Sequence, residues 1–75
     1  MQATVIEPMF QWNTRWYIVL EVSGHQRRCK VPFRYNRVMC KVTGDKTLQE
    51  LVKGDVITVE MEFTGGTWKL VSVLS

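Results

Sequence analysis

The sequence predicts an all-β fold, a five-stranded barrel with one short helix between its third and fourth strands. Two observations support this prediction. Apolar and polar residues alternate along much of the chain, which is the pattern of strands that bury one face. Short pieces that contain Gly, Asn or Asp separate these segments and are typical of tight turns. With 75 residues, the chain is expected to form a single domain, residues 1–75.

The first predicted strand covers residues 3–11, which include Thr, Val, Ile and Phe, all residues that favour strands. Because Pro8 cannot donate a hydrogen bond to a neighbouring strand, we expect a bulge or a sheet edge there. Residues 12–15, with the sequence Trp-Asn-Thr-Arg, form the predicted turn into the second strand.

The second and third strands are predicted as one hairpin over residues 16–35, with its turn at residues 23–25. On the second strand, alternation turns Trp16, Ile18, Leu20 and Val22 inward and Tyr17, Val19 and Glu21 outward. On the third strand it turns Cys29, Val31 and Phe33 inward and Arg28, Lys30 and Arg34 outward. The outer face of the hairpin therefore combines an aromatic ring with three cations, whereas solvated faces usually mix both signs of charge.

The segment between this hairpin and the fourth strand is predicted to hold the only helix. Residues 36–43 fit a short strand or an extended piece, and residues 44–45 fit a turn. Residues 47–50, with the sequence Thr-Leu-Gln-Glu, form a capping-box pattern that predicts a helix of one to two turns. Leu48, Leu51 and Val52 would then pack against the sheet, and Gly54 suits the left-handed position that follows a helix.

The fourth strand is predicted over residues 55–63, where Ile57, Val59, Met61 and Phe63 alternate with Thr58, Glu60 and Glu62. Residues 64–67 form a hairpin connection, and residues 68–74 form the last strand. Val71 and Val73 blur the alternation of that strand, as if both of its faces were partly covered. This order of strands and helix is that of the OB-fold, a small barrel that binds oligonucleotides and oligosaccharides.

Residues 51–60, Leu-Val-Lys-Gly-Asp-Val-Ile-Thr-Val-Glu, carry a resemblance to known OB-fold families. They resemble the L-x-K-G-D-x-V-x-V-E stretch that leads into the fourth strand of bacterial single-stranded-DNA-binding proteins. In size the chain is nearer to single-strand binders of phages or mobile elements. It is also similar in size and strand order to bacterial translation initiation factor one. The resemblance implies an OB-fold and single-stranded nucleic-acid binding, with a homodimer as one possible assembly.

Charge is distributed unevenly along the chain. Residues 1–41 hold seven of the ten Lys and Arg residues but two of the seven Asp and Glu residues. This asymmetry favours an anionic partner. The absence of a signal-peptide pattern or a long apolar run predicts a cytoplasmic protein without membrane contact. Cys29, Cys40 and His25 fit no disulfide framework or metal motif, so we expect a buried Cys29, a turn position for His25, and no metal or cofactor.

The candidate site residues follow from placing the sequence on the OB frame, where a ligand crosses strands two and three between two flanking loops. Bases would stack on aromatic rings while cations track the phosphates. The candidates are Trp12, Arg15, Tyr17, Arg27, Arg28, Lys30, Arg34, Tyr35, Arg37 and Trp68. Three alternatives stay open. Trp68 fits the core as well as a ligand platform, Trp12 and Tyr17 could pack on residues 8–10, and the basic run could be an ordinary solvated face.

The predicted partner is therefore single-stranded DNA or RNA, with DNA favoured and little sequence preference. The first rival keeps the barrel but binds RNA or the ribosome, as the resemblance to initiation factor one implies. The rival of another class is a protein–protein module whose interface would use Val19, Val71 and Val73 on outer faces. The chain has one histidine and no nucleophile–base spacing, so neither an enzymatic activity nor a small-molecule substrate is expected.

Overall fold

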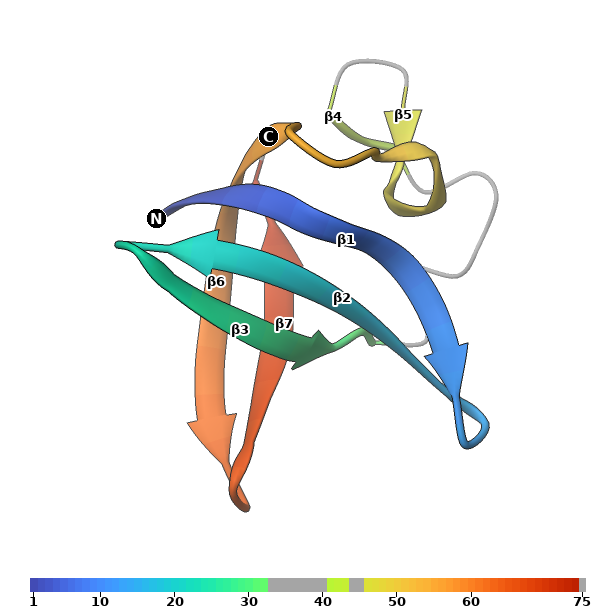
Figure 1. The fold of residues 1–75 in the computed structure, drawn as a ribbon, viewed down its shortest axis with the longest axis vertical. Coiled ribbons are helices and arrows are strands. Elements are labelled where there is room, and N and C mark those ends of the chain that lie inside the picture. Colours follow the sequence, from blue (N-terminus) through green and yellow to red (C-terminus); the bar gives the residue numbers. More distant parts are fainter. Residues whose placement is uncertain (33–40, 44–45, 75) are drawn as a thin grey trace.

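The structure, a computed structural model, describes residues 1–32, 41–43 and 46–74 (Figure 1). Five long strands form a closed barrel: β1 (Gln2–Trp12), β2 (Arg15–Val22), β3 (His25–Lys30), β6 (Val56–Thr64) and β7 (Thr67–Val73). Two short strands, β4 (Lys41–Thr43) and β5 (Lys46–Thr47), pair beside the barrel. One 3₁₀ turn, η2 (Leu48–Glu50), follows β5.

The strands of the barrel are ordered β1-β2-β3-β7-β6, and β6 closes the ring by pairing with β1. Neighbouring strands run antiparallel except β3 and β7, which run parallel. This is the strand order of an OB-type barrel with a short helical turn between the third and fourth barrel strands. The prediction of an all-β fold with this architecture is confirmed.

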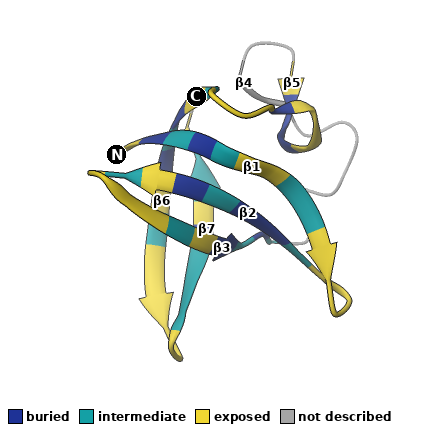
Figure 2. Ribbon diagram, viewed as in Figure 1, coloured by how far each residue is buried: buried dark blue, intermediate teal, exposed yellow. Residues whose placement is uncertain are grey.

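The core lies inside the barrel, where alternate residues of each strand meet (Figure 2). Its buried members on the strands and just beyond β3 are Ala3, Val5, Ile18, Leu20, Cys29, Val31, Ile57, Val59 and Leu70. Leu48 and Leu51 add the η2 segment to the same cluster. Trp16, predicted on the inward side of β2, is half-buried and packs against this core.

Three two-residue turns connect the barrel hairpins, and each has two residues with positive φ. The values are 52° and 66° at Asn13 and Thr14, 53° and 81° at Ser23 and Gly24, and 60° and 77° at Gly65 and Gly66. Two positive φ values in a row define the type I′ geometry, whose twist matches that of paired strands. The three predicted turns are confirmed, although His25 already belongs to β3.

The pairing of β1 with β2 is irregular around Pro8. The β1–β2 register shifts between Val5 and Glu7 and again between Glu7 and Phe10. Pro8 lies within the second of these shifts. The bulge predicted at Pro8 is thus confirmed.

The β6–β7 register shifts where Glu60 pairs with Ser72 and Met61 with Leu70, which leaves Val71 as an extra residue. Because of this bulge, Leu70 and Val73 both contact the core although they are three residues apart. The expectation that Val73 lies on an outer face was wrong.

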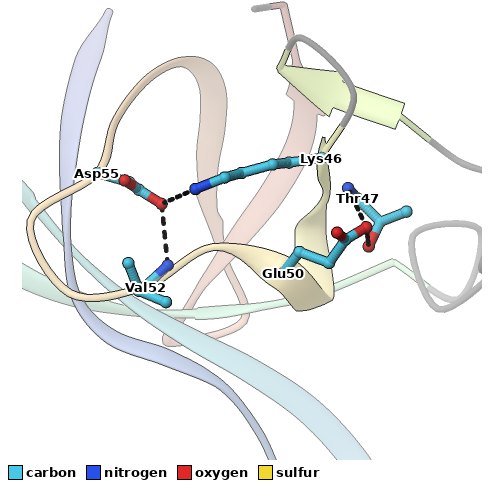
Figure 3. Close-up of polar contacts among 5 residues, drawn as sticks. All are labelled: Lys46, Thr47, Glu50, Val52 and Asp55. Atoms are coloured by element: carbon cyan, nitrogen blue, oxygen red, sulfur yellow. Dashed lines mark hydrogen bonds and ion pairs between the residues drawn. The ribbon is translucent and has the colours of Figure 1, made fainter.

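The predicted helix after residue 47 is shorter than expected and has a different buried face. It is a single 3₁₀ turn, and Leu51 already has an extended backbone with φ −68° and ψ 141°. The Glu50 carboxylate accepts from the Thr47 amide at 3.1 Å and from the Thr47 hydroxyl at 3.0 Å (Figure 3). Leu48 and Leu51 are buried as predicted, but Val52 is 54% exposed, so its assignment to the buried face was wrong.

A tight turn at residues 52–55 explains why the helix stops. The Val52 amide donates to the Asp55 carboxylate at 2.9 Å, and the Asp55 amide donates to the Val52 carbonyl at 3.1 Å. Lys46 reaches the same carboxylate at 3.5 Å (Figure 3). Gly54, with φ 96°, donates to the Val5 carbonyl at 2.8 Å and ties the turn to β1. The Val52 amide is therefore engaged by a side chain instead of a helical carbonyl.

Several predicted features lie outside the described residues. They are the end of the third strand at Phe33, Arg34 and Tyr35, the neighbouring Arg37 and Cys40, and the turn at residues 44–45. The described part of β3 ends at Lys30, although the Val31 amide still donates to the Trp16 carbonyl at 2.8 Å. Of the ambiguous segment 36–43, residues 41–43 form β4. The part of the chain that the structure describes contains no helix with the length and apolar character needed to span a membrane.

Candidate nucleic-acid interface

The outer face of β2 and β3 carries most of the described candidate residues. Tyr17 pairs with Lys30 and Val19 with Arg28, so these four side chains share one face of the hairpin. Their neighbours Ile18 and Cys29 pair with each other and are buried in the core. Burial of the apolar side thus fixes the register that turns the basic side outward.

Three aromatic rings and one guanidinium form a cluster on this face, which we call the outer aromatic cluster: Phe10, Trp12, Tyr17 and Arg28. The Phe10 and Tyr17 rings stack at 5.9 Å, and the Trp12 and Tyr17 rings lie 6.2 Å apart. The Arg28 guanidinium lies over both Tyr17, at 5.5 Å, and Trp12, at 5.7 Å. Tyr17 is left 9% exposed while Trp12 is 56% exposed, so Trp12 offers the accessible ring.

Beside this cluster lies a polar hollow of about 220 Å³. It is lined by Arg15, Tyr17, Lys30, Thr64, Gly65, Thr67 and Lys69. Three of these residues are cations, and they come from three different strands, β2, β3 and β7. Lys30 and Lys69 meet because they are partners in the parallel β3–β7 pairing.

A second hollow of about 400 Å³ adjoins the first, and both share Lys30 and Lys69 as walls. Its other lining residues are Val31, Pro32, Glu62, Leu70 and Val71, so we call it the apolar hollow. Figure 1 shows the turns of the β1–β2 and β6–β7 hairpins projecting on the side of the barrel away from β4 and β5. Arg15 follows the first of these turns, and Gly65 lies in the second.

The cations of the polar hollow have no anionic partner in the described part of the chain. The ion pair found there within 4.0 Å joins Lys46 to Asp55, on the far segment before β6. Glu62 is the strand partner of Lys69, but its carboxylate forms no ion pair within that distance. Like charges that are gathered without neutralisation create a positive potential that favours an external anion.

Arg27 and Trp68, also candidates, lie in a different cluster together with Phe63. Trp68 pairs with Cys29 across the β3–β7 seam and packs against the core, so it faces the opposite side of β7 from Lys69. The Arg27 guanidinium and the Phe63 ring each lie 5.2 Å from the centre of the Trp68 ring. We call these three residues the inner aromatic cluster. Trp68 is thus half-buried at the rim of the core.

The predicted burial of Cys29 is confirmed, whereas His25, predicted in the turn, lies at the first position of β3. Cys29 is fully buried, and this burial raises the pKa of its thiol from 9.0 to about 11, although the nearby Arg27 charge lowers it slightly. His25 is exposed at the first position of β3. Among the residues that the structure describes, no three His, Cys, Asp or Glu side chains are grouped so that they could hold a metal ion.

Sequence reasoning missed Lys69, Phe10 and the hairpin residues Thr64, Gly65 and Thr67. The outward position of Lys69 could have been predicted, because Lys69 follows Trp68 and must face the other side of the strand. Its meeting with Lys30 depends on the non-local β3–β7 pairing, which only the OB strand order suggests. Phe10 stacks on Tyr17 because the two residues are partners in the β1–β2 pairing. Of the remaining candidates, Arg34, Tyr35 and Arg37 lie outside the described residues.

The fold and this face define a small OB-type barrel with a basic and aromatic outer surface. Comparison of the chain with family models, curated proteins and solved structures found no match. The resemblance to single-stranded-DNA-binding proteins therefore stays a prediction that is based on residues 51–60 and on the strand order.

Proposed function

We propose that this barrel binds single-stranded nucleic acid, with DNA favoured and little sequence preference, along the outer face of β2, β3 and β7. The observation that carries the proposal is the polar hollow, whose three cations have no anionic partner among the described residues. Tyr17 lines this hollow and contacts the exposed Trp12 ring of the outer aromatic cluster. Cations neutralise phosphates, and a ring accepts any base face, so this combination suits a single strand of any sequence.

The described residues divide between two roles. Trp12 stacks a base, while Arg15, Arg28, Lys30 and Lys69 neutralise phosphates. Tyr17 has little exposed ring area because Phe10, Trp12 and Arg28 cover it, so it supports the platform and lines the polar hollow. A barrel of this size covers a few nucleotides, since OB-folds occupy about 4–16 nucleotides each. The proposed setting is the cytoplasm, with a nucleic-acid partner that belongs to the cell or to a phage or mobile element.

The test is a titration of the protein with fluorescein-labelled oligo-dT, followed by fluorescence anisotropy at low and high salt. Oligo-U and duplex DNA of the same length serve as competitors. We expect oligo-dT to bind, salt to weaken binding, and duplex to compete poorly because its bases are not free to stack. Equal competition by duplex DNA, or no binding at low salt, would overturn the proposal. Stronger competition by oligo-U would reassign the partner to RNA.

A further inference from the structure

The polar hollow gathers more positive charge than an internal phosphate of a strand requires. Its three cations, Arg15, Lys30 and Lys69, converge on a space of about 220 Å³. An internal phosphodiester carries a single negative charge, whereas a terminal phosphate carries about −1.5 to −2 at pH 7. The charge balance of the hollow is therefore closer to that of a terminal phosphate.

The walls of the hollow also suit a phosphate group at the end of a chain. Arg15 and Tyr17 come from β2, whereas Thr64 and Gly65 come from the end of β6 and from the β6–β7 turn. Thr64, Thr67 and Tyr17, whose side chains carry hydroxyl groups, line the hollow together with the cations. Charged and neutral donors of this kind are those that bind phosphate oxygens in proteins.

The apolar hollow gives the end nucleotide a place beside its phosphate. The two hollows share Lys30 and Lys69, and the larger one, of about 400 Å³, is walled by Val31, Leu70 and Val71. This volume lies in the range of small-ligand sites. Glu62 lines the apolar hollow but not the polar hollow. Its carboxylate therefore repels a phosphate from the apolar hollow, which leaves the polar hollow as the better place for it.

We propose that the polar hollow holds the terminal phosphate of a bound single strand, with the end nucleotide in the apolar hollow. The inference rests on the proposed function and adds to it a preference for strands that carry a phosphate at one end. Lys30 and Lys69 are the specificity-determining residues, because both line the two hollows and they are partners in the β3–β7 pairing.

The experiment compares short oligo-dT with a 5′-phosphate, with a 3′-phosphate and with neither, each as a competitor of labelled oligo-dT. We expect one phosphorylated form to bind about tenfold more tightly than the unphosphorylated form, the effect of one further charge-assisted hydrogen bond. In Lys69→Gln and, independently, in Arg15→Gln, this ratio falls to near one. Lys53→Gln removes an exposed lysine outside both hollows and keeps the full ratio.

The pH dependence of the ratio provides a second readout. The second pKa of a terminal phosphate is about 6, so the ratio falls between pH 7.5 and pH 5 as the terminal phosphate loses its second negative charge, while backbone phosphates keep their charge. The unphosphorylated oligomer corrects for titration of the protein itself. The charged and titratable groups that line the two hollows are Arg15, Tyr17, Lys30, Glu62 and Lys69.

Each outcome distinguishes the inference from the proposed function. If oligo-dT binds but both phosphorylated forms bind no better, the end-recognition inference is overturned and single-strand binding stands. A preference that survives both Lys69→Gln and Arg15→Gln overturns the assignment to the polar hollow. If no oligomer binds at all, both proposals are overturned.

Discussion

Trp12 is the residue whose accessibility most directly supports base stacking. Its ring is 56% exposed and is held by Tyr17 and by the Arg28 guanidinium 5.7 Å away. An ordered ring loses little entropy when a base stacks on it, and such stacking is worth about 1–3 kcal/mol. Tyr17, which the sequence presented as an equal candidate, is 9% exposed because its neighbours cover it.

Replacement of Trp12 by Leu is expected to weaken oligo-dT binding by roughly 5- to 150-fold, which corresponds to the loss of one stacked base. The matched control is Phe63→Leu, because Phe63 is 57% exposed but belongs to the inner aromatic cluster. Fluorescence anisotropy with a labelled oligomer measures both variants. Equal losses in Trp12→Leu and Phe63→Leu would show that the outer face is not the platform.

Cys29 is expected to be chemically inert in the native protein. Burial raises the pKa of its thiol to about 11, and the thiolate is the reactive form. In a Cys40→Ser background, Ellman's reagent at pH 8 should react about a hundredfold more slowly than with a free thiol of ordinary pKa. In guanidinium chloride, which unfolds the protein, one thiol per chain should react rapidly with the reagent. Rapid reaction without denaturant would contradict the burial.

The same thiol predicts a pH dependence of stability on the alkaline side. The pKa of Cys29 is higher in the folded state than its ordinary value of 9.0, so its contribution to the free energy of unfolding is fully present below pH 9.0. That contribution is lost as pH rises from about 9 toward about 11. Unfolding by urea across this range should therefore show a steeper loss in the Cys40→Ser protein than in the Cys29→Ala, Cys40→Ser protein.

At the scale of the element, the β1–β2 turn carries a backbone conformation that its sequence does not favour. Thr14 has φ 66°, a left-handed conformation that is unfavourable for a β-branched residue. The other two hairpin turns place Gly at the corresponding position, at Gly24 and Gly66. The turn thus stores strain next to Arg15 and Trp12, two residues of the proposed interface.

Replacement of Thr14 by Gly is expected to stabilise the protein by about 1 kcal/mol, because Gly adopts positive φ without a steric cost. In a domain of this size that corresponds to a rise in Tm of about 4–8 °C. Thermal unfolding followed by circular dichroism measures the change. Thr14→Ala is the control, since it keeps a Cβ in the left-handed region and should gain much less. An unchanged or lowered Tm in Thr14→Gly would contradict the strain.

The turn at residues 52–55 is held together by one carboxylate. The hydrogen bond from the Val52 amide, and then the charge of Lys46, lower the pKa of Asp55 below its ordinary value of 3.8. A carboxyl whose pKa is lowered on folding stabilises the native state above its ordinary pKa. That stabilisation is lost as the pH falls through the lower, folded-state value.

Asp55→Asn is expected to lower Tm at pH 7 and to flatten the loss of Tm on acidification below pH 3.8. Asn keeps an oxygen that accepts from the Val52 amide, so the variant isolates the contribution of charge. Thermal unfolding from pH 2.5 to pH 7 measures both effects. Glu62→Gln serves as the control, because Glu62 forms no ion pair within 4.0 Å in the described part of the chain. Parallel curves for wild type and Asp55→Asn would contradict this role.

At the scale of the whole molecule, the alternating pattern of the sequence was sufficient to predict the barrel. Burial of Ile18, Leu20 and Cys29 fixes the register of the β2–β3 hairpin. The residues that alternate with them must then face outward. The turns were predictable because each contains residues that tolerate positive φ, apart from Thr14.

The parts of the candidate site that escaped prediction depend on which residues are partners across paired strands. Lys69 reaches Lys30 through the parallel β3–β7 pairing, and Phe10 covers Tyr17 through the β1–β2 pairing. Local periodicity contains no information on such pairings, so it could identify the basic face but not the hollow within it.

The proposed interface also predicts how binding responds to salt. If Arg15, Arg28, Lys30 and Lys69 each neutralise one backbone phosphate of an oligomer without a terminal phosphate, the logarithm of the binding constant should fall with the logarithm of salt concentration with a slope of about −3. Lys69→Gln should reduce the slope by about 0.7, while Lys53→Gln should leave it unchanged. Titrations of oligo-dT at several salt concentrations give these slopes. A slope near zero would exclude a phosphate-binding face.

The most direct test of the central claim is a ¹H–¹⁵N NMR titration of the whole chain with short oligo-dT at low salt. We expect the largest shifts at amides of the outer face and the polar hollow, namely Trp12, Arg15, Tyr17, Arg28, Lys30, Gly65, Thr67 and Lys69. Amides at the β1–β6 seam, such as Thr4, Val56 and Thr58, should hardly move. Shifts concentrated at that seam, or none at any concentration of oligomer, would contradict the claim that a single strand binds across β2, β3 and β7.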